Sequence, residues 1–182
     1  AQFVSISSLN EEIRNKTITV TGFSKSFGMA GLRIGVIVAH NKQHYDQILE
    51  ISMHKSTIHG GNVLSQIAAT AALEKCDYWL EEFVNHTKKM RDLLVREINT
   101  IPNLSCIAPD GCYVAFINIQ KTNKTSKEIY ETLLNEAKVA VVPGLEEWFG
   151  KGAEGYIRIC FSTSEAILQE SIARISKCQE WR

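Results

Sequence analysis

The sequence predicts an α/β protein with two folded parts that a long helical segment joins. Two strand-length apolar runs, residues 17–21 and 34–39, lie near the start of the chain. Apolar residues then follow helical spacing from Val63 to Ile98. After Pro102, short strand candidates alternate with helical stretches, which is typical of a second, smaller α+β unit.

Composition and charge exclude several classes of protein. The 182 residues are 45% hydrophobic and 22% charged, with 20 basic residues against 20 acidic ones. This balance argues against binding to nucleic acid or to an anionic membrane. No apolar run approaches the roughly 20 residues that a membrane helix needs, and the N-terminus does not resemble a signal peptide. The five cysteines are odd in number and lack a Cys-x-x-Cys pair, so we expect a cytoplasmic protein without a metal site.

The two apolar runs predict buried strands. Residues 17–21 are β-branched throughout, and residues 34–39 read IGVIVA. Continuous apolar runs fit a sheet that is covered on both faces, as the parallel sheets of α/β proteins are. We therefore expect parallel or mixed pairing here. The Gly- and Ser-rich residues 22–33 are expected to form a turn-rich connection.

The helical segment is long, and its spacing leaves two interpretations open. About 36 residues exceed the length of most globular helices, so we expect either a break near Lys75 to Asp77 or one long helix between two domains. Beyond it we expect four strands and two helices, the last helix capped by Thr163 or Ser164. The strands are expected at residues 104–107, 113–119, 139–142 and 156–161, and the helices at 126–137 and 164–178. One apolar stripe of the last helix is expected from Ile167, Leu168, Ile172 and Ile175.

The connection between the first two strands carries the residue types of a cofactor site. Lys25 follows the first strand, and Arg33 stands eight residues later at the start of the second. Partial burial there would lower the pKa of the amine and make it a nucleophile toward an aldehyde. A guanidinium suits a phosphate, because its planar fork donates two parallel hydrogen bonds. Ser24 offers a further hydroxyl for that phosphate, or else only solvates the loop. Taken singly, such residues are usually solvated surface residues.

The whole spacing of residues 24–35, S-K-S-F-G-M-A-G-L-R-I-G, resembles the pyridoxal-phosphate attachment signature of class I aminotransferases, in the aspartate aminotransferase superfamily of fold type I. The resemblance implies that Lys25 is the catalytic Schiff-base lysine and that Ser24 and Arg33 bind the cofactor. One departure is Gly22, where many relatives have a serine.

The resemblance continues to the C-terminus. Residues 109–113 resemble the family's Pro-x-Gly-x-Tyr/Phe motif, and residues 141–144 with Phe149 and Gly150 resemble its active-site loop. Residues 154–159 match the G-x-x-R-[IL] strand, which implies that Arg158 binds the substrate α-carboxylate. The alternative is an arginine on the exposed side of that strand.

The resemblance implies a domain order and a function. Residues 1–60 would end the large cofactor domain, residues 61–101 would be the interdomain helical segment, and residues 102–182 the small C-terminal domain. The implied reaction is amino transfer between an amino acid and a 2-oxo acid in a homodimer with pyridoxal 5'-phosphate. The family's aspartate for the pyridine nitrogen has no match here, so we expect a fragment, about the last 45 per cent of such an enzyme, that is inactive or nearly so by itself.

Three alternatives stay open at this stage. The same lysine motif occurs in carbon-sulfur lyases and aminocyclopropane-carboxylate synthases, which keep the cofactor and change the reaction. A ligand-sensing domain of a transcription regulator can resemble an aminotransferase and would need a DNA-binding domain upstream. Finally, the chain could fold without binding any cofactor.

Overall fold

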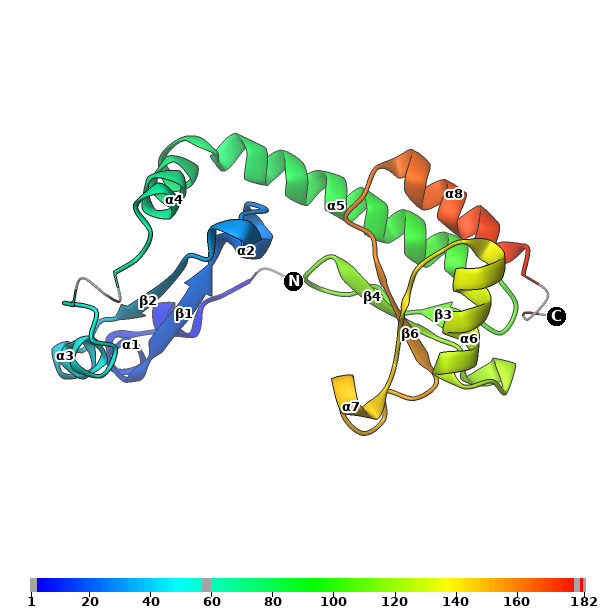
Figure 1. The fold of residues 1–182 in the computed structure, drawn as a ribbon, viewed down its shortest axis with the longest axis horizontal. Helices are drawn as coiled ribbons and strands as arrows, with labels where there is room; N and C mark the ends of the chain where they lie inside the picture. Colours follow the sequence, from blue (N-terminus) through cyan, green and yellow to red (C-terminus); the bar gives the residue numbers. More distant parts are fainter. Residues whose placement is uncertain (1–2, 57–59, 179–180, 182) are drawn as a thin grey trace. The chain divides into compact units, whose positions relative to one another are not determined.

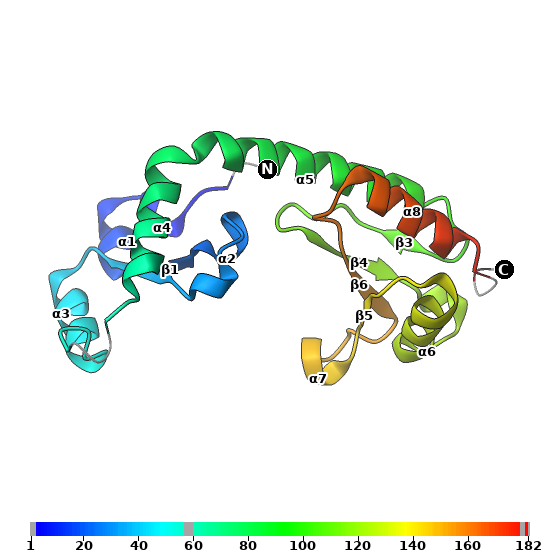
Figure 2. The same cartoon turned by 45° about the horizontal axis from the view of Figure 1, so that its top comes forward.

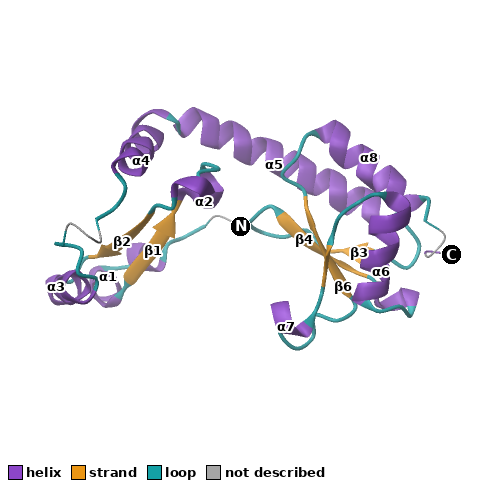
Figure 3. Ribbon diagram, in the orientation of Figure 1, coloured by secondary structure: helices purple, strands orange, loops and turns teal. Residues whose placement is uncertain are grey.

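The computed structural model of the chain describes residues 3–56, 60–178 and 181. The chain forms two compact units, Ala1–Glu82 and Phe83–Arg182, and the boundary between them falls inside helix α5 (Asp77–Ile98) (Figure 1). Both units combine helices and strands, which gives a mixed α/β chain (Figure 3). Residues 57–59, which close the expected first domain, lie outside the described residues.

The first unit contains a two-stranded sheet of β1 (Ile18–Gly22) and β2 (Gly35–Ala39), close to the positions expected for the first two strands. The strands pair antiparallel, with Gly22 opposite Gly35, so the expected parallel or mixed pairing is wrong for this two-stranded sheet. The reason is the connection, residues 23–34. It forms only short helical turns, whereas a parallel crossover usually runs through a full helix, and it returns the chain directly beside β1.

The expected burial of these strands is also wrong for the described chain. Val20 is 73% exposed and Ile37 is 52% exposed. Two strands alone bury little apolar surface, and the described residues of this unit leave most of the side chains on β1 and β2 open. An apolar run therefore predicts a strand with two apolar faces, but it does not predict which segment packs on those faces.

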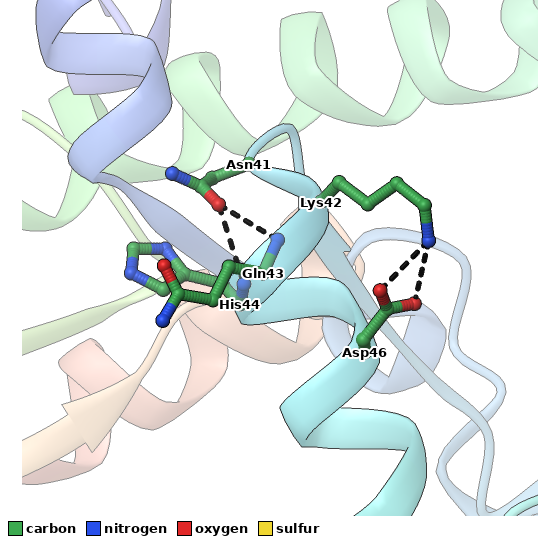
Figure 4. Close-up of polar contacts among 5 residues, drawn as sticks. All are labelled: Asn41, Lys42, Gln43, His44 and Asp46. Atoms are coloured by element: carbon green, nitrogen blue, oxygen red, sulfur yellow. Dashed lines mark hydrogen bonds and ion pairs between the residues drawn. The ribbon is translucent and has the colours of Figure 1, made fainter.

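Asparagine caps begin the longer helices of this unit, which are α1 (Glu11–Lys16), α3 (Lys42–Ile51) and α4 (Val63–Lys75). At α3, the Oδ1 atom of Asn41 accepts hydrogen bonds from the backbone N–H groups of Gln43 at 2.8 Å and His44 at 3.4 Å (Figure 4). The Nζ atom of Lys42 lies 2.7 Å from the carboxylate of Asp46, one turn along the same helix. Such caps satisfy N–H groups that the helix itself leaves unpaired.

The long helical segment is broken at Cys76, between α4 and α5. This confirms the break expected near Lys75 to Asp77 and excludes one continuous helix. Within the described residues, no helix combines the length and the hydrophobicity that crossing a bilayer requires.

The second unit contains an antiparallel sheet in the order β3-β4-β6-β5. Its strands are β3 (Ser105–Cys106), β4 (Val114–Asn118), β5 (Val142–Pro143) and β6 (Tyr156–Cys160), all near their expected positions. Its further helices are α6 (Ser126–Thr132), which continues as a π-helical turn (Leu133–Ala137), the short α7 (Glu146–Phe149) and α8 (Glu165–Ser176). Helices α5 and α8 lie side by side in both views (Figures 1 and 2).

Alternation along β4 and β6 separates a buried face from an open face. Ala115, Ile117, Ile157 and Ile159 are buried and belong to a core that residues of α5, α6 and α8 complete. Ser164 caps α8 as expected, because its hydroxyl accepts the N–H of Ile167. The side chain of Ile167 is 57% exposed, however, so the expected apolar stripe excludes it.

Candidate functional site

The residue expected to carry the chemistry, Lys25, lies in a single helical turn directly after β1. This turn, α2 (Phe23–Ser26), is closed by the carbonyl oxygen of Phe23, which accepts the N–H groups of Phe27 and Met29 at 3.2 Å each. Phe23 is buried. Side chains two positions apart on a helix point about 200° apart, so burial of Phe23 turns Lys25 outward. Lys25 is accordingly exposed to solvent among the described residues. The expectation that its amine is partly buried is therefore wrong for this part of the chain.

An aromatic stack holds this turn, and the sequence analysis missed it. The rings of Phe23 and Phe27 lie 6.0 Å apart, and Phe27 stacks on Trp79 at 6.2 Å with an interplanar angle of 21°. Offset stacking of this kind is worth about 0.5–1.5 kcal/mol beyond area burial. The spacing of Phe23 and Phe27, four residues apart in a segment assigned as loop, was the available signal.

Arg33 has an unusual backbone conformation. Its φ of 50° and ψ of 46° lie in the left-handed region, at the end of a short 3-10 turn (Ala30–Leu32). For a residue other than glycine this costs on the order of 1–3 kcal/mol, and such conformations cluster at functional sites. The neighbouring backbone is held by Ser65, a buried residue of α4 whose hydroxyl donates a 2.6 Å hydrogen bond to the carbonyl of Leu32.

Lys25 and Arg33 lie near the same end of the β1–β2 hairpin. Gly22 pairs with Gly35, so Lys25 comes three residues after one member of this pair and Arg33 two residues before the other. The pairing is close, because a Cβ added at Gly35 would lie 3.2 Å from a carbonyl oxygen of β1. Ser24 is half-buried in the same turn. Among residues 3–56, 60–178 and 181, the side chains of Ser24, Lys25 and Arg33 have no hydrogen-bond or ion-pair partner.

This donor set fits a phosphorylated aldehyde. A primary amine can condense with an aldehyde, and a guanidinium with a hydroxyl can donate to phosphate oxygens. Ser24, Lys25 and Arg33 all lie in the connection between β1 and β2, which belongs entirely to the first unit. This set of donors therefore needs no residue of the second unit.

Arg158 lies in the second unit, on the open face of the sheet. It occupies the middle of β6, opposite Phe116 of β4 and Val142 of β5. Its side chain is half-buried, and its Cζ atom lies 5.5 Å from the ring centre of Phe149. No carboxylate of the described residues forms an ion pair with it. Arg158 therefore lies on the side of β6 away from the core, half-buried and beside an aromatic ring that the sequence did not indicate, and its role as a carboxylate ligand stays a prediction.

Comparison with known proteins supports the resemblance. The sequence model of the family "Aminotransferase class I and II" matches residues 1–175. Aspartate aminotransferase from Pyrococcus abyssi is 37% identical over 175 residues, which cover 95% of this chain and 43% of that protein. The crystal structure of aromatic aminotransferase from Pyrococcus horikoshii OT3 has a TM-score of 0.83 at 35% identity, with coverage of 97% of this chain and 46% of the other.

A third relative was crystallised with the cofactor. A PLP-bound structure from Clostridium difficile 630 has a TM-score of 0.85 at 27% identity and covers 95% of this chain and 44% of that one. The chain thus spans less than half the length of each of these relatives. Since the family's sequence model matches nearly the whole chain, the chain belongs to the class I and II aminotransferases.

Proposed function

We propose that the protein containing this chain transfers an amino group from an amino acid to a 2-oxo acid, with pyridoxal 5'-phosphate as its cofactor. One observation carries the proposal: an amine, a hydroxyl and a guanidinium without protein partners among the described residues arise from one connection of the β1–β2 hairpin. Membership of the family, with a PLP-bound relative, supports the choice of cofactor.

Each residue of this set has a distinct task in the proposal. Lys25 holds the cofactor through its amine, and Arg33 and Ser24 hold the phosphate, Arg33 by charge-assisted hydrogen bonds and Ser24 through its hydroxyl. The cofactor, when bound, supplies the electron-withdrawing ring that stabilises negative charge at the substrate Cα. The left-handed backbone at Arg33 fixes where its side chain leaves the loop.

Lys25 and Arg158 act on the substrate. With the cofactor bound, the Nζ atom of Lys25 would accept the proton from the substrate Cα and deliver it to the cofactor carbon that carries the transferred nitrogen, a general acid-base contribution of roughly 10²–10⁴-fold. Arg158 binds the α-carboxylate through two parallel hydrogen bonds, which orients the Cα–H bond.

The proposal is tested on the full-length protein by trapping. Borohydride reduction of the protein loaded with cofactor should fix a covalent adduct on the peptide that contains Lys25, detected by mass spectrometry and by the loss of imine absorbance. Lys25→Ala should lose that adduct, and amino transfer should fall by about 10²-fold or more. Lys42→Ala is the matched control, because Lys42 is an exposed lysine of the same unit whose amine is paired with Asp46. An adduct that persists in Lys25→Ala would refute the assignment.

The rival reactions separate in a half-reaction with one amino acid. Amino transfer leaves the amino group on the protein-bound cofactor, whereas a carbon-sulfur lyase releases a keto product and ammonia. A ligand-sensing domain would show neither outcome, and sequencing upstream of Ala1 would reveal a DNA-binding domain. The division into residues 1–60, 61–101 and 102–182, the homodimer, the cytoplasmic location and the inactivity of the isolated chain stay predictions.

A further inference from the structure

One phenylalanine ring lies beside the half-buried Arg158 on the open face of the second unit's sheet, and a second ring contacts the first. We call Phe116, Phe149 and Arg158 the arginine–phenylalanine cluster. The ring of Phe149 lies 5.5 Å from the Cζ atom of Arg158, and the ring of Phe116 meets that of Phe149 edge-on at 5.2 Å and 89°. Phe116 and Phe149 are 39% and 37% exposed, so neither belongs to the buried core.

The fold brings the cluster together from three segments. Phe116 and Arg158 are directly opposite in the register of β4 and β6, and their side chains share the face away from the core. Phe149 arrives from α7, whose last turn is closed by a 3.0 Å hydrogen bond from its N–H to the carbonyl of Leu145. Gly150 then turns the chain at a φ of 82°. The contact between Phe149 and Arg158 is thus held by two backbone structures, the pairing of β4 with β6 and the closed turn of α7.

An aromatic ring can orient a guanidinium without consuming its donors. The ring attracts the cation through the negative charge on its face, while all five N–H groups stay available at the edge of the guanidinium. A carboxylate in place of the ring would occupy the same fork that a ligand carboxylate needs. The edge-on contact of Phe116 in turn restricts rotation of the Phe149 ring. The cluster therefore limits the orientations of Arg158 and leaves its fork free.

We propose that Phe149, supported by Phe116, is a positioning residue that orients Arg158 for bidentate binding of the substrate carboxylate. The inference rests on the proposed function, in which Arg158 binds that carboxylate. It adds a determinant of affinity that acts through Arg158 and contacts no reacting atom.

The test measures carboxylate binding to the full-length protein by calorimetry. The probes are succinate and 3-phenylpropanoate, which have no amino group and therefore do not react with the cofactor. Phe149→Leu removes the aromatic ring and should raise the dissociation constant about three- to tenfold. Phe149→Tyr keeps the ring face and should restore the constant of the unmodified protein. Trp148→Leu removes a neighbouring exposed aromatic side chain of α7 and should leave binding unchanged.

A second pair of variants separates this inference from the proposed function. Arg158→Leu should abolish binding of both probes; unchanged binding, or no binding of either probe to the unmodified protein, would contradict the carboxylate role of Arg158 itself. If Arg158→Leu abolishes binding while Phe149→Leu binds normally, or if Phe149→Tyr fails to restore binding, the positioning role alone is overturned. Should Phe149→Leu not fold, Phe116→Leu provides the decision: it should weaken binding about twofold or more, and unaltered binding would refute the inference.

Discussion

Gly144 is the residue whose replacement should disturb the second unit most specifically. It follows β5 and leads into α7, and its N–H donates a 2.9 Å hydrogen bond to the carbonyl of Tyr156. A Cβ added there would lie 2.7 Å from the same carbonyl oxygen and closer still to that of Ala153. Both obstacles are backbone atoms, so no side-chain rotation can relieve the overlap. Either the hydrogen bond lengthens or the loop moves.

The magnitude for Gly144→Ala follows from these contacts. Overpacking costs about 1–3 kcal/mol and the weakened hydrogen bond about 0.5–1.5 kcal/mol, while lower entropy of the unfolded chain returns about 0.4–1 kcal/mol. The net loss in the free energy of unfolding is about 0.5–4 kcal/mol, measured by urea unfolding of the full-length protein followed by circular dichroism. Gly111→Ala is the control, because a Cβ at Gly111 meets nothing within 4 Å. Equal stability of the two variants, within about 0.5 kcal/mol, would refute the steric reasoning.

Two further predictions concern ionisable groups. Burial raises the pKa of the Cys106 thiol, so iodoacetamide at mildly alkaline pH should label the exposed Cys112 first and Cys106 only after unfolding, as peptide mass spectrometry would show; equal labelling rates in the folded protein would contradict this. The backbone N–H and then the hydroxyl of Thr125 lower the pKa of Glu128. The ionised carboxylate of Glu128 therefore contributes its full stabilisation at pH values above the ordinary carboxyl pKa. That contribution is lost as the pH falls through the lowered pKa of the folded protein. Glu128→Gln should flatten the acid side of the melting temperature plotted against pH, and an unchanged slope would count against the cap.

The positions of the elements were predictable where local chemistry decides them. The β-branched residues 17–21 predicted a strand, and β1 forms within one residue of that range. The cap at Ser164 was also visible in the sequence, because a hydroxyl before an apolar helical pattern is a local signal. The break at Cys76 was open between two interpretations, since helix length alone does not decide it.

What the sequence did not reveal depends on contacts between segments. The pairing direction of β1 and β2 follows from how residues 23–34 fold, which composition does not encode. The left-handed backbone at Arg33 and the ring of Phe149 beside Arg158 were also not predictable, because each depends on the path that a loop takes between two elements. Gly144 ends the motif of residues 141–144, yet the reason that glycine is needed there lies in the two backbone carbonyl groups beside it, which only the structure shows.

The absence of an acidic partner distinguishes Arg158 from another partly buried arginine of the same unit. Arg91 has a side chain that is 28% exposed, and its guanidinium lies 2.7 Å from the carboxylate of Asp92. Arg158 is also half-buried, yet within the described part of the chain it contacts a ring instead of a carboxylate. Withdrawing a guanidinium from water without an anion is costly, and a ring offsets only part of that cost. An anion at the free fork would recover the remaining cost, which is the physical basis of the proposed carboxylate role of Arg158.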